Sequence, residues 1–355
     1  MRVLIAPDSF GDTLTSVEAA AAIAAGWRRA RPDDDLVPAP QSDGGPGFVD
    51  VLSVRGGRVH AATVSGPLGA PVVARWLHLG DVAYLESAQA CGLHLLGRAP
   101  DPQTAVAAHS TGVGELVAAA ADAGAGTVVV GLGGSGCTDG GRGLVGALGG
   151  TVDAAGLAAA RDRLCGIRLI AATDVENPLL GPSGAAAVFG PQKGADPDAL
   201  DLLERRNTDW ARTLDAVAPR PVSGRAGAGA AGGIGAALLA LGADRRSGAE
   251  VVADLTGQDA LLSAADLVIT GEGRFDHQSL GGKVAVAVAR AARRQGTAVL
   301  VLAGQVAVDP ADPDVAVLGL RGLHSVAEHA GGVQIALDDA ARSLAALAET
   351  VAGRW

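Results

Sequence analysis

Short runs of β-branched and aliphatic residues alternate with alanine-rich stretches along most of this chain of 355 residues. Such alternation is typical of α/β folds, in which parallel strands are joined by helices. It predicts buried strands at residues 3–6, 127–130, 168–172, 266–270 and 297–303. Thr15 and Glu18 have the spacing of a capping box, so we expect a helix to begin there and to run to about Arg29.

Residues 58–86 follow a different pattern. Three strand-like runs, 59–64, 72–79 and 82–85, are separated by turns that contain glycine, which predicts an antiparallel meander. The strand–helix order returns near residue 260. We therefore expect two α/β domains. The first is discontinuous and comprises residues 1–60 plus 260–355, and the second is inserted and comprises residues 61–259.

The composition limits the partners of the chain. A net charge of −10 argues against a nucleic-acid partner, because neutralising phosphates requires a basic face. Cys91, Cys137 and Cys165 are far apart and fit neither a disulfide framework nor paired metal ligands, which indicates a reducing cytoplasm. No apolar segment approaches a signal peptide or a membrane span, so we expect a cytoplasmic protein without a membrane partner.

The two lysines of the chain are unusual. Of 28 lysines and arginines, only Lys193 and Lys283 are lysines, and both lie in glycine-rich turns. A lysine presents a compact ammonium group, which suits a tight phosphate-binding turn better than the planar fork of arginine. Both lysines are therefore candidate phosphate-binding residues. The alternative is that they are solvent-facing residues without a special role.

Functional side chains follow several of the predicted strands. Ligands of open α/β sheets bind outside the carboxyl ends of the strands, so these positions are candidates for a site. Carboxylates beside glycine-rich turns suit phosphoryl transfer from a magnesium nucleotide, because amides and lysines hold phosphates while carboxylates hold Mg²⁺ or accept the hydroxyl proton. For each aspartate the alternative is a helix cap or a turn former. The candidates are Asp8, Ser9, Asp43, Gly133, Gly134, Ser135, Asp139, Asp174, Gly271, Glu272 and Arg274.

Residues 131–136 also satisfy the GxGxxG template of dinucleotide-binding folds. The template has little specificity in a chain with 52 glycines. Asp139 would also place an anion inside the phosphate cradle, where a pyrophosphate requires amides. A nicotinamide-dependent dehydrogenase is therefore a less favoured alternative.

Longer motifs connect these turns. They are residues 5–10, 43–45, 112–116, 133–135, 139–141, 177–195, 227–233 and 266–273, with Gly282-Lys283 behind them. With these motifs the chain resembles the bacterial glycerate kinases of type I over nearly its whole length. The resemblance implies phosphorylation of glycerate by ATP with Mg²⁺. It also implies a flavodoxin-like (Rossmann-like) parallel-sheet domain and an inserted mixed-sheet domain, with the active site in the cleft between them.

The resemblance assigns roles to the candidate residues. It implies catalytic roles for Asp43, Asp8 and Lys283, and Mg²⁺ ligation by Asp139 and Asp174. Binding of phosphates and substrate is expected of Ser9, Lys193, Arg274, Gly133, Gly134, Ser135, Gly271 and Glu272. The partners would be a small hydroxy acid and a nucleotide, and a homodimer is compatible with these roles.

The chain departs from the family pattern at three motifs. Lys-Gly usually follows Phe10, where this chain has Gly11-Asp12, and Glu usually follows Gly45, where it has Pro46. Asn usually precedes Asp139, where this chain has Thr138. These departures leave open a catalytically altered paralogue that acts on another hydroxy acid or binds a metabolite without turnover. The sequence also leaves open whether the product is 2- or 3-phosphoglycerate.

Overall fold

The computed structural model describes residues 1–11, 13–281 and 283–355. Contacts divide the chain into two units, Met1–Ser42 with Ala249–Trp355, and Asp43–Gly248. Both junctions lie earlier in the chain than residues 60 and 260, where we expected them. At the first junction the difference arises because α2 (Phe48–Ser53) packs on strands of the second unit.

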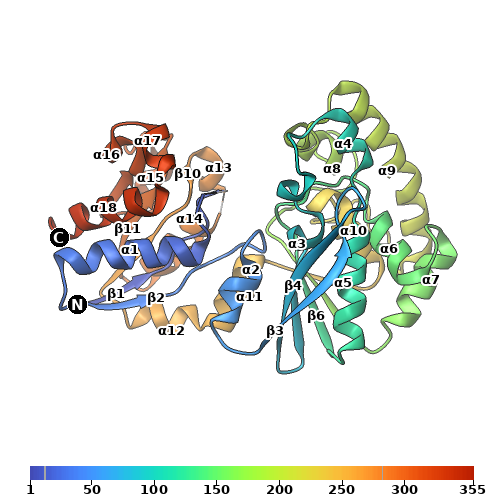
Figure 1. The fold of residues 1–355 in the computed structure, drawn as a ribbon, viewed down its shortest axis with the longest axis horizontal. Coiled ribbons are helices and arrows are strands. Elements are labelled where there is room, and N and C mark those ends of the chain that lie inside the picture. Colours follow the sequence, from blue (N-terminus) through green and yellow to red (C-terminus); the bar gives the residue numbers. More distant parts are fainter. Residues whose placement is uncertain (12, 282) are drawn as a thin grey trace. The chain divides into compact units, whose positions relative to one another are not determined.

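The first unit contains a sheet of five parallel strands in the order β13-β11-β9-β1-β2 (Figure 1). The strands are β1 (Arg2–Ile5), β2 (Asp35–Pro38), β9 (Leu267–Thr270), β11 (Ala298–Ala303) and β13 (Gly322–Ser325). Numbered along the unit, this is the 2-1-3-4-5 order of flavodoxin-like folds. The expected flavodoxin-like domain is confirmed, and its topological switch point lies between β1 and β9.

Helices cover both faces of this sheet. They are α1 (Ser16–Ala30), α11 (Gly248–Thr256), α12 (Gln258–Ser263), α13 (His277–Leu280), α14 (Val284–Arg294), α15 (Pro313–Ala316), α16 (Val326–Ala330), α17 (Val333–Asp338) and α18 (Ala340–Ala352). A short parallel pair, β10 (Arg274–Phe275) and β12 (Gln305–Val306), lies beyond the strand ends.

The core of the first unit explains its sequence pattern. Val3 and Ile5 of β1 pack in one cluster with α1 and α18, whereas Leu4 packs in another with α12 and α14. Because both faces of the sheet are buried at its centre, strands β1, β9 and β11 read as nearly continuous apolar runs. The predicted capping box is present at the start of α1, where Glu18 N donates to Thr15 Oγ1 at 3.2 Å.

The second unit contains a mixed sheet of six strands in the order β3-β4-β5-β6-β7-β8. The strands are β3 (Arg58–Ser65), β4 (Pro71–Leu79), β5 (Val82–Glu86), β6 (Thr127–Gly131), β7 (Arg168–Ala172) and β8 (Asp244–Arg246). The first three are antiparallel, which confirms the predicted meander, and β5 to β8 are parallel. The carboxyl ends of the parallel strands therefore share one edge.

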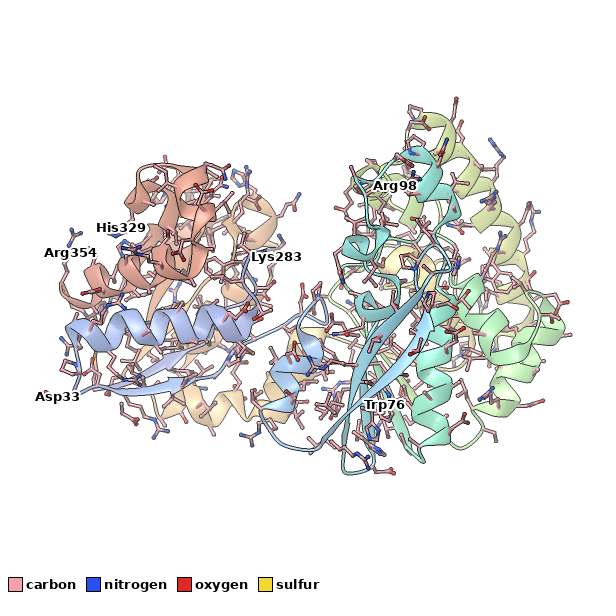
Figure 2. All side chains as sticks on the ribbon, in the orientation of Figure 1. Asp33, Trp76, Arg98, Lys283, His329 and Arg354 are labelled. Carbon is pink, nitrogen blue, oxygen red and sulfur yellow. The ribbon has the colours of Figure 1, made fainter. Side chains whose placement is uncertain are left out.

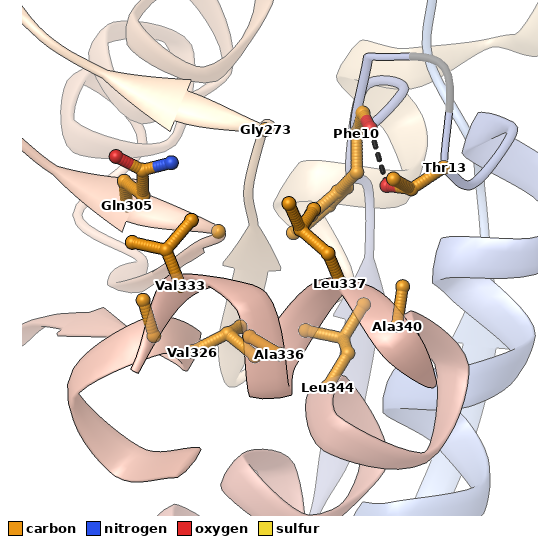
Figure 3. A pocket seen from close by; sticks show the side chains of 12 residues that line it. Phe10, Thr13, Gly273, Gln305, Val326, Val333, Ala336, Leu337, Ala340 and Leu344 are labelled. Carbon is orange, nitrogen blue, oxygen red and sulfur yellow. Dashed lines mark hydrogen bonds between the residues drawn. The ribbon is translucent and has the colours of Figure 1, made fainter. Parts of the chain in front are cut away.

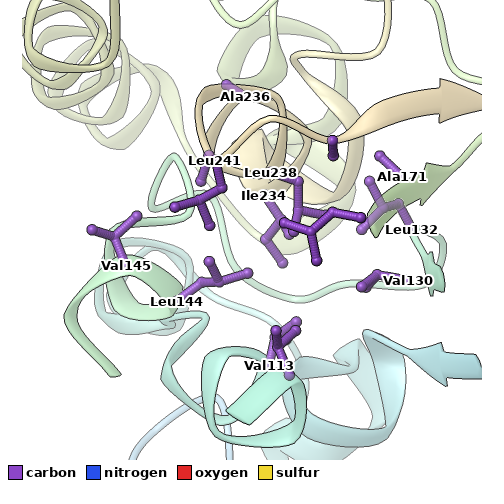
Figure 4. Close-up of a cluster of buried hydrophobic side chains, with 14 of the residues drawn as sticks. Val113, Val130, Leu132, Leu144, Val145, Ala171, Ile234, Ala236, Leu238 and Leu241 are labelled. Atoms are coloured by element: carbon purple, nitrogen blue, oxygen red, sulfur yellow. The ribbon is translucent and has the colours of Figure 1, made fainter. Parts of the chain in front are cut away.

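Helices α5 and α10 pack on this sheet, and α6 packs against both of them. Val113, Leu144 and Ile234 of these helices meet Val130 and Ala171 of β6 and β7 in one buried cluster (Figure 4). Burying each such side chain contributes about 1.5–3 kcal/mol, so the cluster fixes the helices beside the strand ends. The helices of the unit are α2 (Phe48–Ser53), α3 (Ala88–Cys91), α4 (Pro102–Ala107), α5 (Thr111–Asp122), α6 (Arg142–Gly149), α7 (Ala154–Arg163), α8 (Ala185–Phe189), α9 (Pro197–Val217) and α10 (Ala230–Ala240), with 3₁₀ turns at η1 (Leu93–Leu96) and η2 (Pro191–Lys193).

No single helix in the described part of the chain is long and apolar enough to cross a membrane. Helices α6 and α7 together have the length and composition of a broken membrane span, with a bend of 64° between them. Leu144 of α6 and Leu157 of α7 are fully buried in the core of the second unit.

Candidate active site

The turn Asp43-Gly44-Gly45 lies against the carboxyl ends of β6 and β7. A β-carbon on Gly44 would lie 2.8 Å from the carbonyl oxygen of Ala172, the last residue of β7. One on Gly131, the last residue of β6, would lie 2.6 Å from the carbonyl oxygen of Gly44. Only glycine permits such close approach. The turn therefore holds Asp43 at this edge, where its Oδ1 accepts a hydrogen bond from Gly45 N at 3.0 Å.

Two other predicted segments share the edge. The turn 133–135 follows β6, and a β-carbon on Gly133 would overlap the Cα of Gly45. Asp174 follows β7 and is exposed. The second unit thus brings Asp43, Asp174 and the turn 133–135 to one edge of one sheet, where open α/β sheets bind ligands.

Asp139, an expected Mg²⁺ ligand, has both carboxylate oxygens occupied by the protein. Its Oδ2 accepts from Ser110 N at 2.9 Å, Ser110 Oγ at 2.9 Å and Gly143 N at 3.0 Å, and its Oδ1 accepts from Gly141 N at 3.1 Å. Three of these donors bind Oδ2 and one binds Oδ1, which keeps a further acceptor position. Ser110 precedes α5 and Gly141 precedes α6. Asp139 therefore caps two helices, and its expected role as a Mg²⁺ ligand stays a prediction.

Lys193 was expected to bind phosphate or substrate but is only 2% exposed. Its Nζ donates to Ser135 Oγ at 3.1 Å and to the carbonyl oxygen of Cys137 at 2.6 Å. Burial lowers the pKa of Lys193. The ammonium group therefore fixes the turn after β6 from within the unit, and its expected contact with phosphate or substrate stays a prediction.

The segment 133–141, here called the glycine loop, has two further anchors. Trp210 Nε1 donates to the carbonyl oxygen of Gly140 at 3.0 Å, and Asn207 Nδ2 donates to that of Thr138 at 3.4 Å. Asn207 is one of two asparagines in the chain, and the scarcity argument applied to lysine would have marked it.

Glu86 ends β5 at the same edge and was not among the predicted site residues. Its side chain is buried, and Oε2 accepts from Gly47 N at 3.1 Å and Val49 N at 3.4 Å. Burial raises the pKa of Glu86 to about 7. Glu86 thus has a pKa near neutrality and bonds the backbone that follows the Asp43 turn. Such a carboxyl group suits an acid–base or positioning role. Glu86 is recognised as a candidate by its burial in the fold, which the sequence alone does not reveal.

In the first unit the predicted residues meet at the switch point between β1 and β9. Asp8 N donates to the carbonyl oxygen of Gly271 at 2.8 Å, and Gly273 N donates to that of Ser9 at 3.3 Å. Ser9 N also donates to Asp8 Oδ1 at 2.7 Å. Glu272 is buried between these glycines. The two strand-end turns therefore run side by side at the usual ligand position of a flavodoxin-like sheet.

Two cationic side chains belong to this unit. Arg274 is exposed, and its Nε lies 3.3 Å from Asp276 Oδ2. Lys283 is exposed immediately before α14 (Figure 2). Both groups are accessible to an anion from solvent. Asp12 and Gly282, which belong to the predicted motifs, lie outside the described residues.

Magnesium needs few protein ligands in this kind of site. Within residues 1–11, 13–281 and 283–355, no group of three or more His, Cys, Asp or Glu side chains could hold a metal ion. In nucleotide sites, however, Mg²⁺ typically takes one or two carboxylates and completes its shell with water and phosphates. Asp174 offers an oxygen ligand of that kind at the strand edge, so its chemistry fits a Mg²⁺ ion that arrives with a nucleotide.

Comparison with known proteins identifies the family. Residues 3–355 match the glycerate kinase family. The chain belongs to the glycerate kinase family. An uncharacterised protein of Mycobacterium bovis is 56% identical over 100% of this chain and 91% of its own length. The glycerate 2-kinase of Escherichia coli is 38% identical over 92% of this chain and 90% of its own length. A solved structure from Salmonella typhimurium LT2, assigned as glycerate kinase 2, matches with a TM-score of 0.78 and 37% identity over 100% of this chain and 98% of its own.

Membership of the glycerate kinase family gives the reaction. The chain is a kinase that phosphorylates glycerate, with ATP as the second substrate. The alternatives of an inactive or altered paralogue and of a dehydrogenase are not favoured. Pro46, one of the departures, lies directly against Gly134, where a β-carbon would be 2.6 Å from its Cγ.

We expect Asp139→Asn to destabilise the protein by about 3 kcal/mol, because it removes the charge and leaves one acceptor oxygen in place of two, while hydrogen bonds to charged groups contribute about 1.5–3 kcal/mol each. Urea unfolding would measure the loss. Asp153→Asn is the matched control, since Asp153 caps only α7 through Gly156 N at 2.8 Å and Asn caps nearly as well. Equal midpoints for the two variants would contradict the shared cap.

Glu86→Gln should change how stability depends on pH. The folded pKa of about 7 lies above the ordinary value of 4.5, so the folded state binds more protons and the wild type loses stability as pH rises through this window. Because glutamine does not ionise, the stability of the variant relative to wild type should rise by about 2 kcal/mol between roughly pH 5 and 8. Urea unfolding at several pH values measures this difference, and a constant difference would contradict the assignment.

Proposed function

We propose that this enzyme transfers the γ-phosphoryl group of ATP, with Mg²⁺, to the 2-hydroxyl of glycerate. The observation that carries the proposal is the edge of the second unit, where Asp43, Asp174 and the turn 133–135 come together. Phosphoryl transfer depends mainly on positioning and on charge stabilisation, and this edge offers carboxylates and amides for both. The 38% identity to the glycerate 2-kinase of Escherichia coli supports the choice of hydroxyl.

In the second unit, Asp43 would accept the proton of the attacking hydroxyl. The turn fixes its carboxylate through Gly45 N, and general bases must be held within hydrogen-bond reach of their substrate. Asp174 would hold Mg²⁺, which neutralises charge on the phosphates when bound. Ser135 Oγ accepts a hydrogen bond from Lys193 Nζ, so its own O–H can donate to an anionic oxygen. Gly133 and Gly134 would contribute backbone amides.

In the first unit, Lys283 and Arg274 would hold phosphates or the substrate carboxylate. Their exposure leaves both cations accessible to an anion. Ser9 and Gly271 would bind phosphate at the switch point, and Glu272 would support the turn between them. Asp8 is the competing candidate for the base, because its carboxylate is also held at a strand end.

We also infer a cytoplasmic enzyme. Cys91, Cys137 and Cys165 are free thiols, which suits a reducing compartment. A homodimer stays a prediction.

Asp43→Asn should lower kcat by about 10²–10⁴ with little change in either KM, because it removes the proton acceptor and keeps the shape of the side chain. Release of ADP with glycerate present measures both parameters. Asp50→Asn is the control on the neighbouring helix α2 and should leave kcat unchanged. If Asp8→Asn abolished turnover while Asp43→Asn retained it, the base would be Asp8 and our assignment would fail.

The product identifies the hydroxyl that is phosphorylated. In 2-phosphoglycerate the phosphorus couples to the single proton on C2, so its proton-coupled ³¹P signal is a doublet. In 3-phosphoglycerate it couples to the two protons on C3 and gives a triplet. We expect the doublet from the purified enzyme, and a triplet would contradict transfer to the 2-hydroxyl.

A further inference from the structure

The first unit has a pocket at the carboxyl edge of its sheet. The pocket encloses about 400 Å³ of space that is partly open to solvent. Phe10 and Thr13 after β1 and Gln305 after β11 line it, together with Val333 and Leu337 of α17. Figure 3 shows Phe10 and Leu337 on one side, and Gln305 and Val333 on the other. Its position at the strand ends is that of a small-molecule site.

The lining is apolar with few polar groups. Thr13 Oγ1 donates to the carbonyl oxygen of Phe10 at 2.6 Å (Figure 3), so it has only acceptor capacity left. Gln305 is half-buried, and its side-chain amide makes no hydrogen bond within the described part of the chain. That amide offers two donors and one acceptor. The pocket therefore suits a flat ligand with apolar faces and a polar edge.

Glycerate does not have this chemistry. Each of its three carbons bears oxygen, so it has no apolar surface to bury. The triphosphate of the donor does not suit the pocket either, because a charge loses its hydration in apolar surroundings. The remaining part of the two substrates is the nucleobase, whose ring faces are apolar and whose edge carries donors and acceptors.

The pocket is continuous with the turn assigned to the phosphates. Gly273 lies in its wall, and Arg274 follows directly in the chain. Gly273 also joins the turn after β1 through its bond to Ser9. We propose that this pocket binds the adenine base of ATP, with Phe10 and Leu337 against one ring face, Val333 against the other and Gln305 at its edge. The assignment rests on the ATP-dependent reaction proposed above.

Charge substitutions at Leu337 test the pocket. Leu337 is 46% exposed, so a polar side chain there leaves the core intact. We expect both Leu337→Glu and Leu337→Lys to raise the Kd for ADP and the KM for ATP by at least about tenfold, because a charge beside the base loses its hydration. The KM for glycerate should change less than about twofold, a free-energy change under roughly 0.5 kcal/mol. A negative and a positive charge are both tested because attraction or repulsion of the phosphates would change the Kd for ADP in opposite directions in the two variants. Loss of base binding would raise this Kd in both.

Ile335→Glu is the matched control. Ile335 lies on the same helix, is 58% exposed and is not part of the pocket lining. This variant should bind ADP like the wild type. Adenosine, which has no phosphates, should bind the wild type in calorimetry and bind more weakly to both Leu337 variants, whereas tripolyphosphate should bind all three alike.

The outcomes separate this proposal from the proposed function. Unchanged ADP and adenosine affinity in both Leu337 variants, with glycerate-dependent turnover intact, would overturn the base pocket and leave the kinase. Opposite effects of the two Leu337 charges on ADP binding would also overturn it. Weakened adenosine binding in a protein that lacks glycerate-dependent turnover would support the pocket while the proposed function failed.

Discussion

The carboxylate of Asp139 is the constraint on which the candidate site of the second unit depends. It accepts hydrogen bonds from the start of α5 and the start of α6, and it lies within the glycine loop. Lys193 holds the same loop through Ser135 and Cys137. Burying an ammonium group without hydrogen-bond partners costs free energy, so these bonds stabilise the buried lysine and also hold the loop in place. A loop fixed in this way presents its amides to a ligand without reorganisation, which favours electrostatic catalysis.

Burial divides the charged residues of the site by role. Lys193 is buried and Asp139 is half-buried, and both form hydrogen bonds with the protein that hold the strand edge in place. Asp174, Arg274 and Lys283 are exposed and accessible to small polar ligands. Glu86 is between these classes, since it supports the backbone after the Asp43 turn and titrates near neutral pH. The turns approach so closely that a side chain would not fit between them, which explains why the motifs are rich in glycine.

The sequence predicted the elements whose local pattern is strong. The buried strands β1, β6, β7, β9 and β11, the meander and the capping box of α1 are where the apolar runs and the cap spacing indicated. It did not predict β2, β8 or β13, whose sequences DLVP, DRR and GLHS contain few β-branched residues. Neighbouring strands impose those strands through pairing, which a local pattern cannot reveal.

The features of the site that the sequence did not predict also depend on residues far apart in the chain. The rarity of Lys193 marked it as important, but rarity does not distinguish a phosphate ligand from a buried support. The bonding of Asp139 depends on Ser110, 29 residues earlier in the chain. The pKa of Glu86 depends on burial by α2 and β5. Only the folded arrangement contains this information.

Release of ADP by the purified wild-type protein tests the central claim most directly. With Mg-ATP present, we expect ADP formation to rise with added D-glycerate and to saturate, and to stay low without glycerate. Saturable, glycerate-dependent ADP would establish the kinase reaction for this chain. ADP formation that is no faster with glycerate than without it would contradict the account.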